Sequence, residues 1–419
     1  MAKIQSVTAR EILDSRGNPT VEASITLDDG SRGTAACPSG ASTGTYEAVE
    51  LRDNDQNRYN GKGVLKAVKN INDIIGRALV GKDPIKQKDI DDLLISLDGT
   101  PNKANLGANA MLSVSLSVAR AQAASEKKPL YQYLTKFNPD FTGIYRMPVP
   151  QMNVINGGKH ANWATDMQEY MIVPIGAKSV HDAIRMCAEV YYLLKVIIQK
   201  KGYATTVGDE GGYAPAVMNN EEPLQLVTEA IEKAGYAPGR EIAFAIDAAA
   251  SEFYENGIYT LTREGKAVTS DELGEFYMHL KAKYPIISME DVFAEDDWEA
   301  FGKFTALVGN TMQTVGDDLY VTNVKRLQKG VDNKTTNAIL IKLNQIGTLT
   351  ETISTILLAR KNNMSCIVSH RSGETNDDFI ADFAVGMQAD FVKFGAPARG
   401  ERVVKYNRLL EIENELTAR

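Results

Sequence analysis

The first third of the chain mixes short alternating segments with helical ones. Hydrophobic and polar residues alternate over Ile4–Leu13 and Thr20–Leu27, which predicts antiparallel strands with a turn at Asp28-Asp29-Gly30. Helical spacing follows at about Gly63–Ile75, and the Ala- and Leu-rich stretch Ala108–Ala124 predicts a buried helix. These segments indicate an N-terminal α+β part.

The pattern changes at about Met147, where short apolar runs begin to alternate with amphipathic helical stretches. The runs lie at Ile242–Ile246, Ile286–Met289, Thr311–Val315, Ala338–Ile341, Ser365–Val368 and Phe391–Val392. The helical stretches include Asp271–Lys283, Thr348–Lys361 and Glu401–Leu416. Strands that alternate with helices predict a parallel sheet, and this many units favour a closed barrel over an open sheet.

A charged residue follows each of these apolar runs. In chain order these residues are Asp247, Glu290, Asp317, Lys342, Arg371 and Lys393. A single Asp at a strand end is usually a turn or helix-capping residue. In a parallel barrel, however, the carboxyl ends of the strands converge on the face that carries the active site. The ordered series therefore predicts three carboxylates and then three cations at one mouth.

These residue types suit a particular chemistry. Asp247, Glu290 and Asp317 supply hard oxygen ligands of the kind that Mg²⁺ prefers. No His or Cys cluster is visible in the sequence, so zinc is not expected. One of the three cations suits a phosphate clamp, and another suits a base whose pKa is lowered by its cationic neighbours. A metal site opposite lysine and arginine is suited to removing a proton next to a carboxylate.

Composition narrows the class of protein. Of the 419 residues, 43% are hydrophobic and 24% are charged, which is typical of a globular chain with a large core. The formal charge of −8 without long runs of one sign argues against a nucleic-acid partner. Three well-separated cysteines suggest no disulfide framework and fit a reducing cytosol. With no signal core and no apolar stretch near the roughly 18 residues of a membrane span, we expect a cytoplasmic protein without a membrane partner.

Longer strings resemble one family along essentially the whole chain. They are Glu11–Thr20, Pro38–Gly44, Met152–Gly158 with His160, Gln168-Glu169, Val207–Gly212, Leu343–Thr348 and Ser369–Thr375. On these motifs the chain is similar to the enolases. The resemblance implies a (β/α)8-type barrel of the enolase kind at residues 139–419. It also implies an N-terminal α+β capping domain at residues 1–138 with a mobile loop.

The resemblance further implies a glycolytic lyase that reversibly dehydrates 2-phospho-D-glycerate to phosphoenolpyruvate. Two Mg²⁺ ions would bind per active site, the second with the substrate. The metal ligands would be Asp247, Glu290, Asp317 and, for the second ion, Ser42. The catalytic residues would be Lys342, Glu210 and Glu169, and the substrate contacts would be His160, Gln168, Lys342, Arg371, Ser372 and Lys393.

The resemblance also assigns the individual roles. Lys342 would take the C2 proton, and Glu210, with Glu169 beside it, would help the C3 hydroxyl to leave. A Lys or His base with one or two Mg²⁺ ions is the known arrangement of enolase-superfamily sites. A lysine near Mg²⁺ and Lys393 is expected to have a depressed pKa. A glutamate beside another glutamate is expected to have a raised pKa and to hold its proton, which assigns the acid role to Glu210.

Two alternatives belong to other functions. Another enzyme of the same superfamily would act on an acid sugar, but Arg371, Ser372 and Ser42 imply a phosphate and a second metal. A role as a surface-displayed adhesin, or as a scaffold in an RNA-degrading complex, would be additional to an intact site. Cell-surface display would then occur without a signal peptide.

The sequence also carries expectations about lineage and assembly. The family suggests a homodimer, with an octamer as the alternative, and the chain length suggests a bacterial type. Val292, Phe394 and Gly400 depart from the family pattern, which leaves the loop geometry around the mouth open.

Overall fold

The structure is a computed structural model that describes residues 2–41 and 44–418. Its N-terminal part contains a three-stranded antiparallel sheet in the order β1 (Ile4–Leu13), β2 (Pro19–Leu27) and β3 (Arg32–Ala36). Buried and partly exposed residues alternate along β2, as expected for a strand with one face on a core. The two alternating segments therefore form the predicted strands to within one residue.

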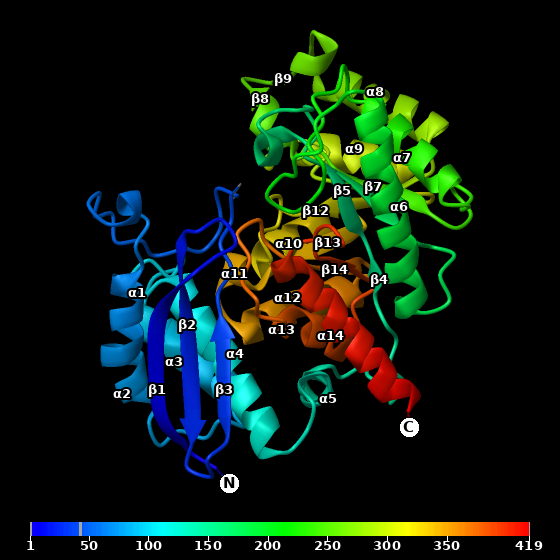
Figure 1. The fold of residues 1–419 in the computed structure, drawn as a ribbon. Coiled ribbons are helices and arrows are strands. Elements are labelled where there is room, and N and C mark those ends of the chain that lie inside the picture. Colours follow the sequence, from blue (N-terminus) through cyan, green and yellow to red (C-terminus); the bar gives the residue numbers. More distant parts are fainter. Residues whose placement is uncertain (1, 42–43, 419) are drawn as a thin grey trace.

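Helix α4 (Ala108–Ser125) lies between this sheet and the barrel (Figure 1). It is buried along most of its length, which confirms the buried helix predicted from its small and apolar residues. At Gly33 of β3, an added Cβ atom would lie 2.2 Å from the carbonyl oxygen of Ser117. Glycine is therefore needed here for the close approach of helix and sheet.

The other elements of this part are short helices. They are η1 (Tyr59–Gly61), α1 (Leu65–Asn70), η2 (Ile71–Ile75), α2 (Gly76–Leu79), α3 (Gln87–Asp98), α5 (Leu130–Leu134) and η3 (Thr135–Phe137). The predicted helix at Gly63–Ile75 begins at Leu65 and continues through a π-helical turn, η2, into α2.

The C-terminal part is built around a nine-element sheet in the order β4-β15-β14-β13-β12-β11-β7-β6-β5. The strands are β4 (Val149–Pro150), β5 (Met152–Asn156), β6 (Glu169–Val173), β7 (Ala243–Asp247), β11 (Ile286–Glu290), β12 (Gln313–Gly316), β13 (Ala338–Ile341), β14 (Ser365–Ser369) and β15 (Phe391–Lys393). Only Gln151 separates β4 from β5, so the two ends of the sheet belong to one continuous segment. The backbone N–H of Gln151 donates to the Val392 carbonyl at 2.7 Å.

This segment closes the sheet into a barrel. With β4 and β5 taken together, the described residues form eight barrel strands. The predicted fold, a (β/α)8-type barrel with an N-terminal α+β capping domain, is therefore confirmed.

The expectation of an entirely parallel sheet is wrong at one strand. β6 is antiparallel to both of its neighbours, β5 and β7, and Glu169 stands opposite Asp247. The connection from β5 to β6 contains only the short helix η4 (Gly158–Ala161) and no crossover helix, so the chain returns beside β5 in the opposite direction. The first residue of β6 consequently lies at the same rim as the last residues of β5 and β7.

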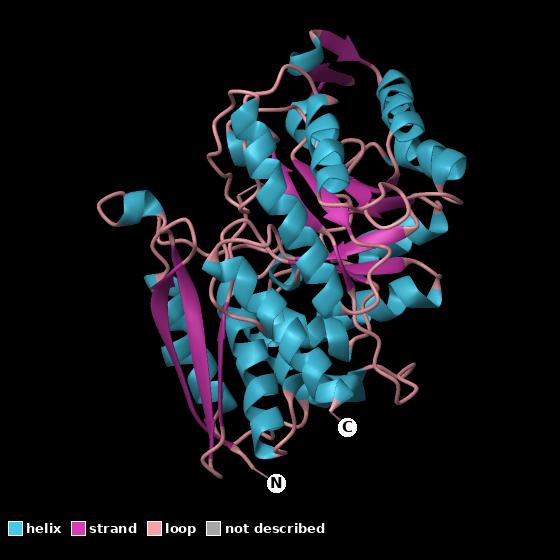
Figure 2. Ribbon diagram, turned by 45° about the vertical axis from the view of Figure 1, so that its right-hand side comes forward, coloured by secondary structure: helices cyan, strands magenta, loops and turns pink. Residues whose placement is uncertain are grey.

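Helices surround the barrel strands, as Figure 2 shows. They are α6 (Val180–Lys200), α7 (Glu222–Lys233), α8 (Ser270–Lys283), α9 (Trp298–Val308), α10 (Val324–Asp332), α11 (Leu343–Ile346), α12 (Leu349–Lys361), α13 (Phe379–Gly386) and α14 (Gly400–Thr417). A small separate sheet contains β8 (Tyr254–Glu255), β9 (Ile258–Leu261) and β10 (Lys266–Val268), with η5 (Ala250–Phe253) and η6 (Thr262–Glu264) beside it. Inside the barrel, a buried cluster of Val315, Ala338, Leu340 and Ile367 forms part of the core.

Polar contacts hold the capping domain against the barrel. Arg120 of α4 pairs with Asp377 at 2.8 Å and with Asp378 at 2.6 Å, just before α13. Asp91 of α3 accepts hydrogen bonds from the backbone and side chain of Thr350 in the first turn of α12. Helix α5 also packs against α13. The domain boundary between residues 138 and 139 stays a prediction. Within residues 2–41 and 44–418, no helix is both long enough and apolar enough to cross a membrane.

Candidate active site

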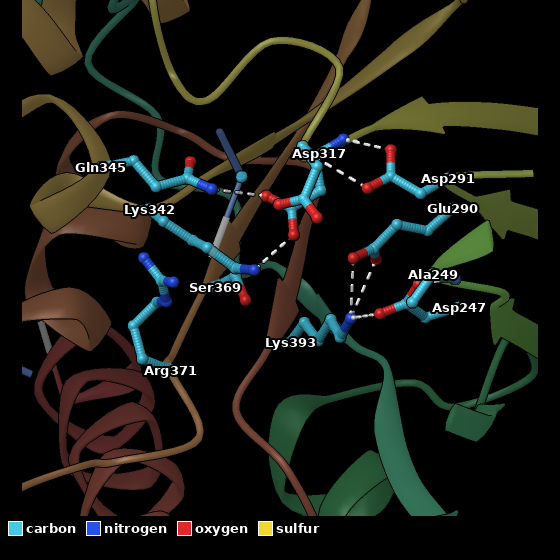
Figure 3. A network of polar contacts seen from close by, with 12 residues as sticks. Asp247, Ala249, Glu290, Asp291, Asp317, Lys342, Gln345, Ser369, Arg371 and Lys393 are labelled. Carbon is cyan, nitrogen blue, oxygen red and sulfur yellow. Dashed lines mark hydrogen bonds and ion pairs between the residues drawn. The ribbon is translucent and has the colours of Figure 1, made fainter. Parts of the chain in front are cut away.

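Six strand ends supply the charged residues of one barrel mouth (Figure 3). Asp247, Glu290 and Lys393 end β7, β11 and β15, Asp317 and Lys342 directly follow β12 and β13, and Arg371 lies two residues after β14. The structure therefore brings together the whole series of charged residues that follow the apolar runs.

A small cavity of about 10 Å³ lies at this mouth. It is lined by His160, Gln168, Glu169, Glu210, Lys342, Ser369, His370, Arg371, Ser372 and Lys393. The lining contains every residue to which the sequence gave a catalytic or substrate-contact role. At this volume the cavity has room for about one water molecule, so the side chains around it must move before a substrate enters, and every lining residue carries a polar group.

Lys393 sits at the centre of a buried carboxylate group. Its Nζ lies 3.2 Å from Asp247 Oδ2, 2.9 Å from Glu290 Oε1 and 3.2 Å from Glu169 Oε2. Burial acts to lower the pKa of Lys393, but Asp247, Glu169 and Glu290 together raise it well above its ordinary value. Lys393 is therefore a fixed positive charge, already paired with residues from three strands.

Lys342 is paired with Asp317 across the mouth. Its ammonium group donates to Asp317 Oδ2, and Gln345 Nε2 donates to Asp317 Oδ1 at 2.8 Å. Although burial acts to lower it, the Asp317 charge raises the pKa of Lys342 above its ordinary value. The expected depression of the Lys342 pKa is thus wrong for this structure, because the argument from Lys393 and a metal left out the carboxylate beside the amine.

The surroundings of the predicted metal ligands suit a divalent cation. Asp247, Glu290 and Asp317 are all at least 95% buried and carry oxygen donors at one rim. Burial and the charges of Asp247 and Asp317 raise the pKa of Glu290 well above its ordinary value. A buried set of repelling carboxylates is what a hard divalent cation would neutralise, so these residues fit such an ion. Ser42, the expected ligand of a second ion, lies outside the described residues.

Asp291 fixes the position of Asp317. Its carboxylate accepts hydrogen bonds from the backbone N–H groups of Asp317 at 2.9 Å and Asp318 at 2.8 Å. Asp291 itself has a φ of +41°, a left-handed conformation that is uncommon for a residue other than glycine. The carboxylates of Asp291, Asp317 and Asp318 offer oxygens within 4.8 Å of one another, so the acidic rim extends beyond the three predicted ligands.

Two glutamates and two histidines form the opposite side of the mouth. Asn153 Nδ2 donates to Glu210 Oε2 at 3.0 Å, while His160 Nδ1 lies 3.5 Å from Glu210 Oε1 and His370 Nε2 lies 3.4 Å from Glu210 Oε2. Burial and the charge of Glu210 raise the pKa of Glu169 well above its ordinary value. Burial acts in the same direction on Glu210, but His370 and His160 bring its pKa well below the ordinary value.

These pKa directions correct the sequence argument for the acid. The expectation that the pKa of Glu210 is raised is wrong for this structure, in which the raised pKa is that of Glu169. The reason is spatial, since the imidazoles and Asn153 converge on Glu210 alone. Burial also lowers the pKa of His370 to about 3, which leaves its ring neutral near pH 7.

The loop that carries Glu210 is tightly folded. The backbone N–H of Gly208 donates to the Gly212 carbonyl at 2.8 Å, and the N–H of Gly212 donates to Asn156 Oδ1 at 3.0 Å. Gly211 has a φ of +89°, which side-chain-bearing residues rarely adopt. The glycines of this motif therefore allow a sharp turn that places Glu210 over β5.

Arg371 is engaged by a residue of the capping domain. Its Nη1 and Nη2 atoms donate to Glu47 Oε2 and Oε1 at 2.9 and 3.0 Å, and Nη1 also donates to Asn344 Oδ1 at 3.0 Å. Ser372 Oγ accepts a hydrogen bond from the Ala41 backbone N–H at 2.8 Å. The chain on both sides of residues 42–43 therefore touches the two residues expected to bind phosphate.

Sequence reasoning missed several residues that shape the site. Glu47, Asn153 and Gln345 were assigned no role, although each binds a predicted functional side chain. Asn153 had a signal, because it is a polar residue within a strand whose five residues are all buried. Glu47 had none, since a single glutamate after a small-residue loop is ordinary surface sequence. Of the departures from the family pattern, Val292 and Phe394 are packed in the core and point to no altered chemistry.

The fold and the mouth define a TIM-barrel enzyme whose active site lies at the carboxyl ends of the strands. Residues 4–134 match the family model described as the enolase N-terminal domain. Residues 144–419 match the model described as the enolase C-terminal TIM barrel domain. The chain therefore belongs to the enolase family, and it is a lyase of the enolase superfamily with acidic groups that can hold a metal ion.

Proposed function

We propose that this chain reversibly dehydrates 2-phospho-D-glycerate to phosphoenolpyruvate, the enolase step of glycolysis and gluconeogenesis. One observation carries the proposal: Lys342 and the Glu169–Glu210 pair line the same small cavity from different parts of the barrel mouth. A base and an acid on different sides of a bound molecule are what removal of a proton and of a hydroxyl from adjacent carbons requires.

Lys342 is the proposed general base for the C2 proton. Its amine lies at the mouth beside Asp317, which Gln345 and Asp291 hold in place. As long as the Lys342 ammonium is paired with Asp317 it cannot accept a proton, so the base function requires Asp317 to be engaged elsewhere. Asp247, Glu290 and Asp317 would bind one Mg²⁺ ion and Ser42 a second, and when bound these ions stabilise negative charge on the substrate carboxylate.

Glu169 and Glu210 are the proposed acid pair for the C3 hydroxyl. Both are buried, and the raised pKa of Glu169 means that it holds a proton more readily than a carboxyl in water does. Asn153 and His370 orient Glu210, while Lys393 contacts Glu169 at 3.2 Å. The proton is therefore retained where the leaving hydroxyl needs it.

The remaining contacts determine which molecule binds. Lys393 and Gln168 are proposed to contact the substrate carboxylate, and Arg371 and Ser372 are proposed to bind the phosphate. His160 is proposed to contact the substrate from the connection between β5 and β6. The planar guanidinium of Arg371 suits bidentate recognition of phosphate, as its bidentate contact with Glu47 illustrates.

The lineage, cellular location and oligomeric state of the chain are also proposals. The chain is proposed to be of bacterial type, to act in the cytoplasm and to form a homodimer, with an octamer as the alternative. Mass measurement in solution at several concentrations distinguishes these assemblies. A display or scaffold role would be additional to catalysis and would leave the mouth unchanged.

The proposed reaction is tested with purified protein, 2-phosphoglycerate and Mg²⁺, by following phosphoenolpyruvate. Turnover is expected to stop on chelation and to return with Mg²⁺. Lys342→Ala is expected to slow C2 proton exchange with solvent by at least about 10³-fold, because the base is lost. Lys325→Ala, at an exposed lysine in α10, serves as the matched control. Exchange at the unsubstituted rate in Lys342→Ala would remove this lysine from its role.

A further inference from the structure

One buried arginine holds the backbone of two loops of the mouth together. Arg402 lies in the first turn of α14 and is fully buried. Its Nη2 atom donates to the carbonyl of Asp209 at 3.0 Å and to that of Ser372 at 2.6 Å, and Nη1 donates to the carbonyl of Arg371. These carbonyls belong to the residue before Glu210 and to the two proposed phosphate contacts. Arg402 therefore joins the loop of the acid pair to the loop that is proposed to bind phosphate.

The same guanidinium determines the tautomer of His370. Arg402 can only donate hydrogen bonds, and its Nη1 lies 2.7 Å from His370 Nδ1, so this ring nitrogen must be the acceptor. The neutral ring then carries its proton on Nε2, which lies 3.4 Å from Glu210 Oε2. Burial lowers the pKa of His370 to about 3, and the charge of Arg402 acts in the same direction. His370 therefore presents a neutral N–H group to the Glu210 carboxylate.

The surroundings of Arg402 are unusual for a buried cation. Glu401 Oε1 lies 3.5 Å from Arg402 Nε, and Nε has no hydrogen-bond partner in the described part of the chain. Lys405, one turn later on α14, is also buried but pairs with Glu374 at 2.9 Å. Burying a charge is costly unless it is paired and hydrogen-bonded. Stability alone therefore gives little reason for an arginine at position 402, whereas its contacts with the mouth give one.

We propose that Arg402 is a positioning residue for the acid step, which holds His370 in the tautomer that directs Glu210. If Nδ1 carried the proton instead, the lone pair of Nε2 would face the Glu210 carboxylate and repel it. The contact of 3.4 Å is longer than an ordinary hydrogen bond, and such contacts in a free enzyme often shorten when the substrate binds. The role in the acid step rests on the proposed function, but the tautomer of His370 does not.

The first measurement is the tautomer of His370 in the unsubstituted full-length protein. NMR of isotope-labelled ring nitrogens distinguishes a protonated nitrogen from one that accepts a hydrogen bond. The chain has only four histidines, so substituting the other three one at a time assigns the His370 signals by elimination. Near pH 7 we expect a protonated Nε2 and an unprotonated Nδ1. A proton on Nδ1, whether in the other tautomer or in a charged ring, overturns the proposal.

The second measurement compares two Arg→Lys substitutions on α14. Arg402→Lys keeps the positive charge but loses the planar fork of donors, so the His370 signals are expected to show both tautomers. At saturating 2-phosphoglycerate we expect dehydration to slow by at least about tenfold, while C2 proton exchange, which depends on Lys342, falls by less than about threefold. Arg408→Lys is the matched control, because Arg408 binds Asp382 of α13 and does not line the mouth. It is expected to keep the tautomer and both rates.

The two proposals fail in distinguishable ways. If 2-phosphoglycerate is not converted, the proposed function fails, while the NMR signals still decide whether Arg402 determines the tautomer of His370. If turnover is normal but Arg402→Lys slows exchange and dehydration equally and leaves the tautomer unchanged, Arg402 supports only the fold and the proposed function stands. The tautomer of the unsubstituted protein needs no Arg402 variant, so it tests the proposal even if Arg402→Lys does not fold.

Discussion

The guanidinium of Arg371 is already bound by a carboxylate in the place where a substrate phosphate is expected. Glu47 accepts from both Nη1 and Nη2, so a phosphate must replace Glu47 to bind this edge of the guanidinium in bidentate fashion. We expect Glu47→Gln to lower the KM for 2-phosphoglycerate by about three- to tenfold, because a buried cation without its counter-charge attracts anions more strongly. Inhibition by inorganic phosphate, measured alongside, is expected to become tighter by a similar factor.

Glu50→Gln is the control for this substitution. Glu50 is a partly buried glutamate of the capping domain, and its carboxylate pairs with Arg52 and Ser39. A higher KM in Glu47→Gln with an unchanged kcat would mean that Glu47 supports Arg371 and does not compete with the substrate.

The raised pKa of Glu169 beside Glu210 leads to a second prediction at the scale of single residues. Glu169→Gln leaves Glu210 without a proton to give, and Glu210→Gln removes the charge that helps Glu169 to keep its proton. We therefore expect each substitution to reduce dehydration by at least about 10²-fold while C2 proton exchange, which depends on Lys342, continues. Equal loss of exchange and dehydration in both variants would contradict the division between base and acid.

At the scale of elements, Asp91 of α3 accepts hydrogen bonds from the first turn of α12 across the interface between the capping domain and the barrel. Its Oδ2 accepts from Thr350 N at 2.9 Å and from Thr350 Oγ1 at 2.6 Å, and burial raises its pKa to about 6. A folded-state pKa above the unfolded value means that the folded state binds the proton more tightly. The contribution of Asp91 to stability therefore falls as pH rises from about 4 to 6, by about 3 kcal/mol in total.

Asp91→Asn removes this titration. The difference in free energy of unfolding between the variant and the unsubstituted protein is expected to shift in favour of the variant between pH 4.5 and 6.5. Guanidinium unfolding at the two pH values measures this difference, and carboxylates shared by both proteins cancel from it. A difference that is constant with pH would show that Asp91 has an ordinary pKa.

The elements also show what the sequence could and could not predict. Period-two and helical patterns located β1, α4 and most barrel strands to within two residues, because these segments bury one face or all of their side chains. The direction of β6 was not predictable in this way. Strand direction depends on the connection, and the connection before β6 contains only one short helix.

Most of the site could be predicted from the residues at strand ends, because a barrel brings the carboxyl ends of its strands together at one rim. What the sequence could not show were contacts between distant segments. The Arg371–Glu47 pair and the approach of His160 to Glu210 join residues from different domains or different loops. The prediction for the pKa of Lys342 was wrong because the sequence does not show that Asp317 lies beside the Lys342 amine.

At the scale of the whole molecule, the mouth is complete only while the capping domain is docked, because Glu47 and residues 38–41 come from that domain. Arg120 contributes to this docking through Asp377 and Asp378, with its side chain about 20% exposed. We expect Arg120→Ala to destabilise the protein by about 2–3 kcal/mol, because it leaves two acidic residues without their mostly buried partner. The KM for 2-phosphoglycerate is expected to rise more than kcat falls, since docking brings the loop to Arg371 but does not move Lys342.

Lys88→Ala, which removes an exposed pair with Asp92 on α3, is expected to leave both the unfolding transition and the KM unchanged. If Arg120→Ala instead lowers kcat with an unchanged KM, the position of the capping domain governs the chemistry at Lys342 and not the capture of the phosphate.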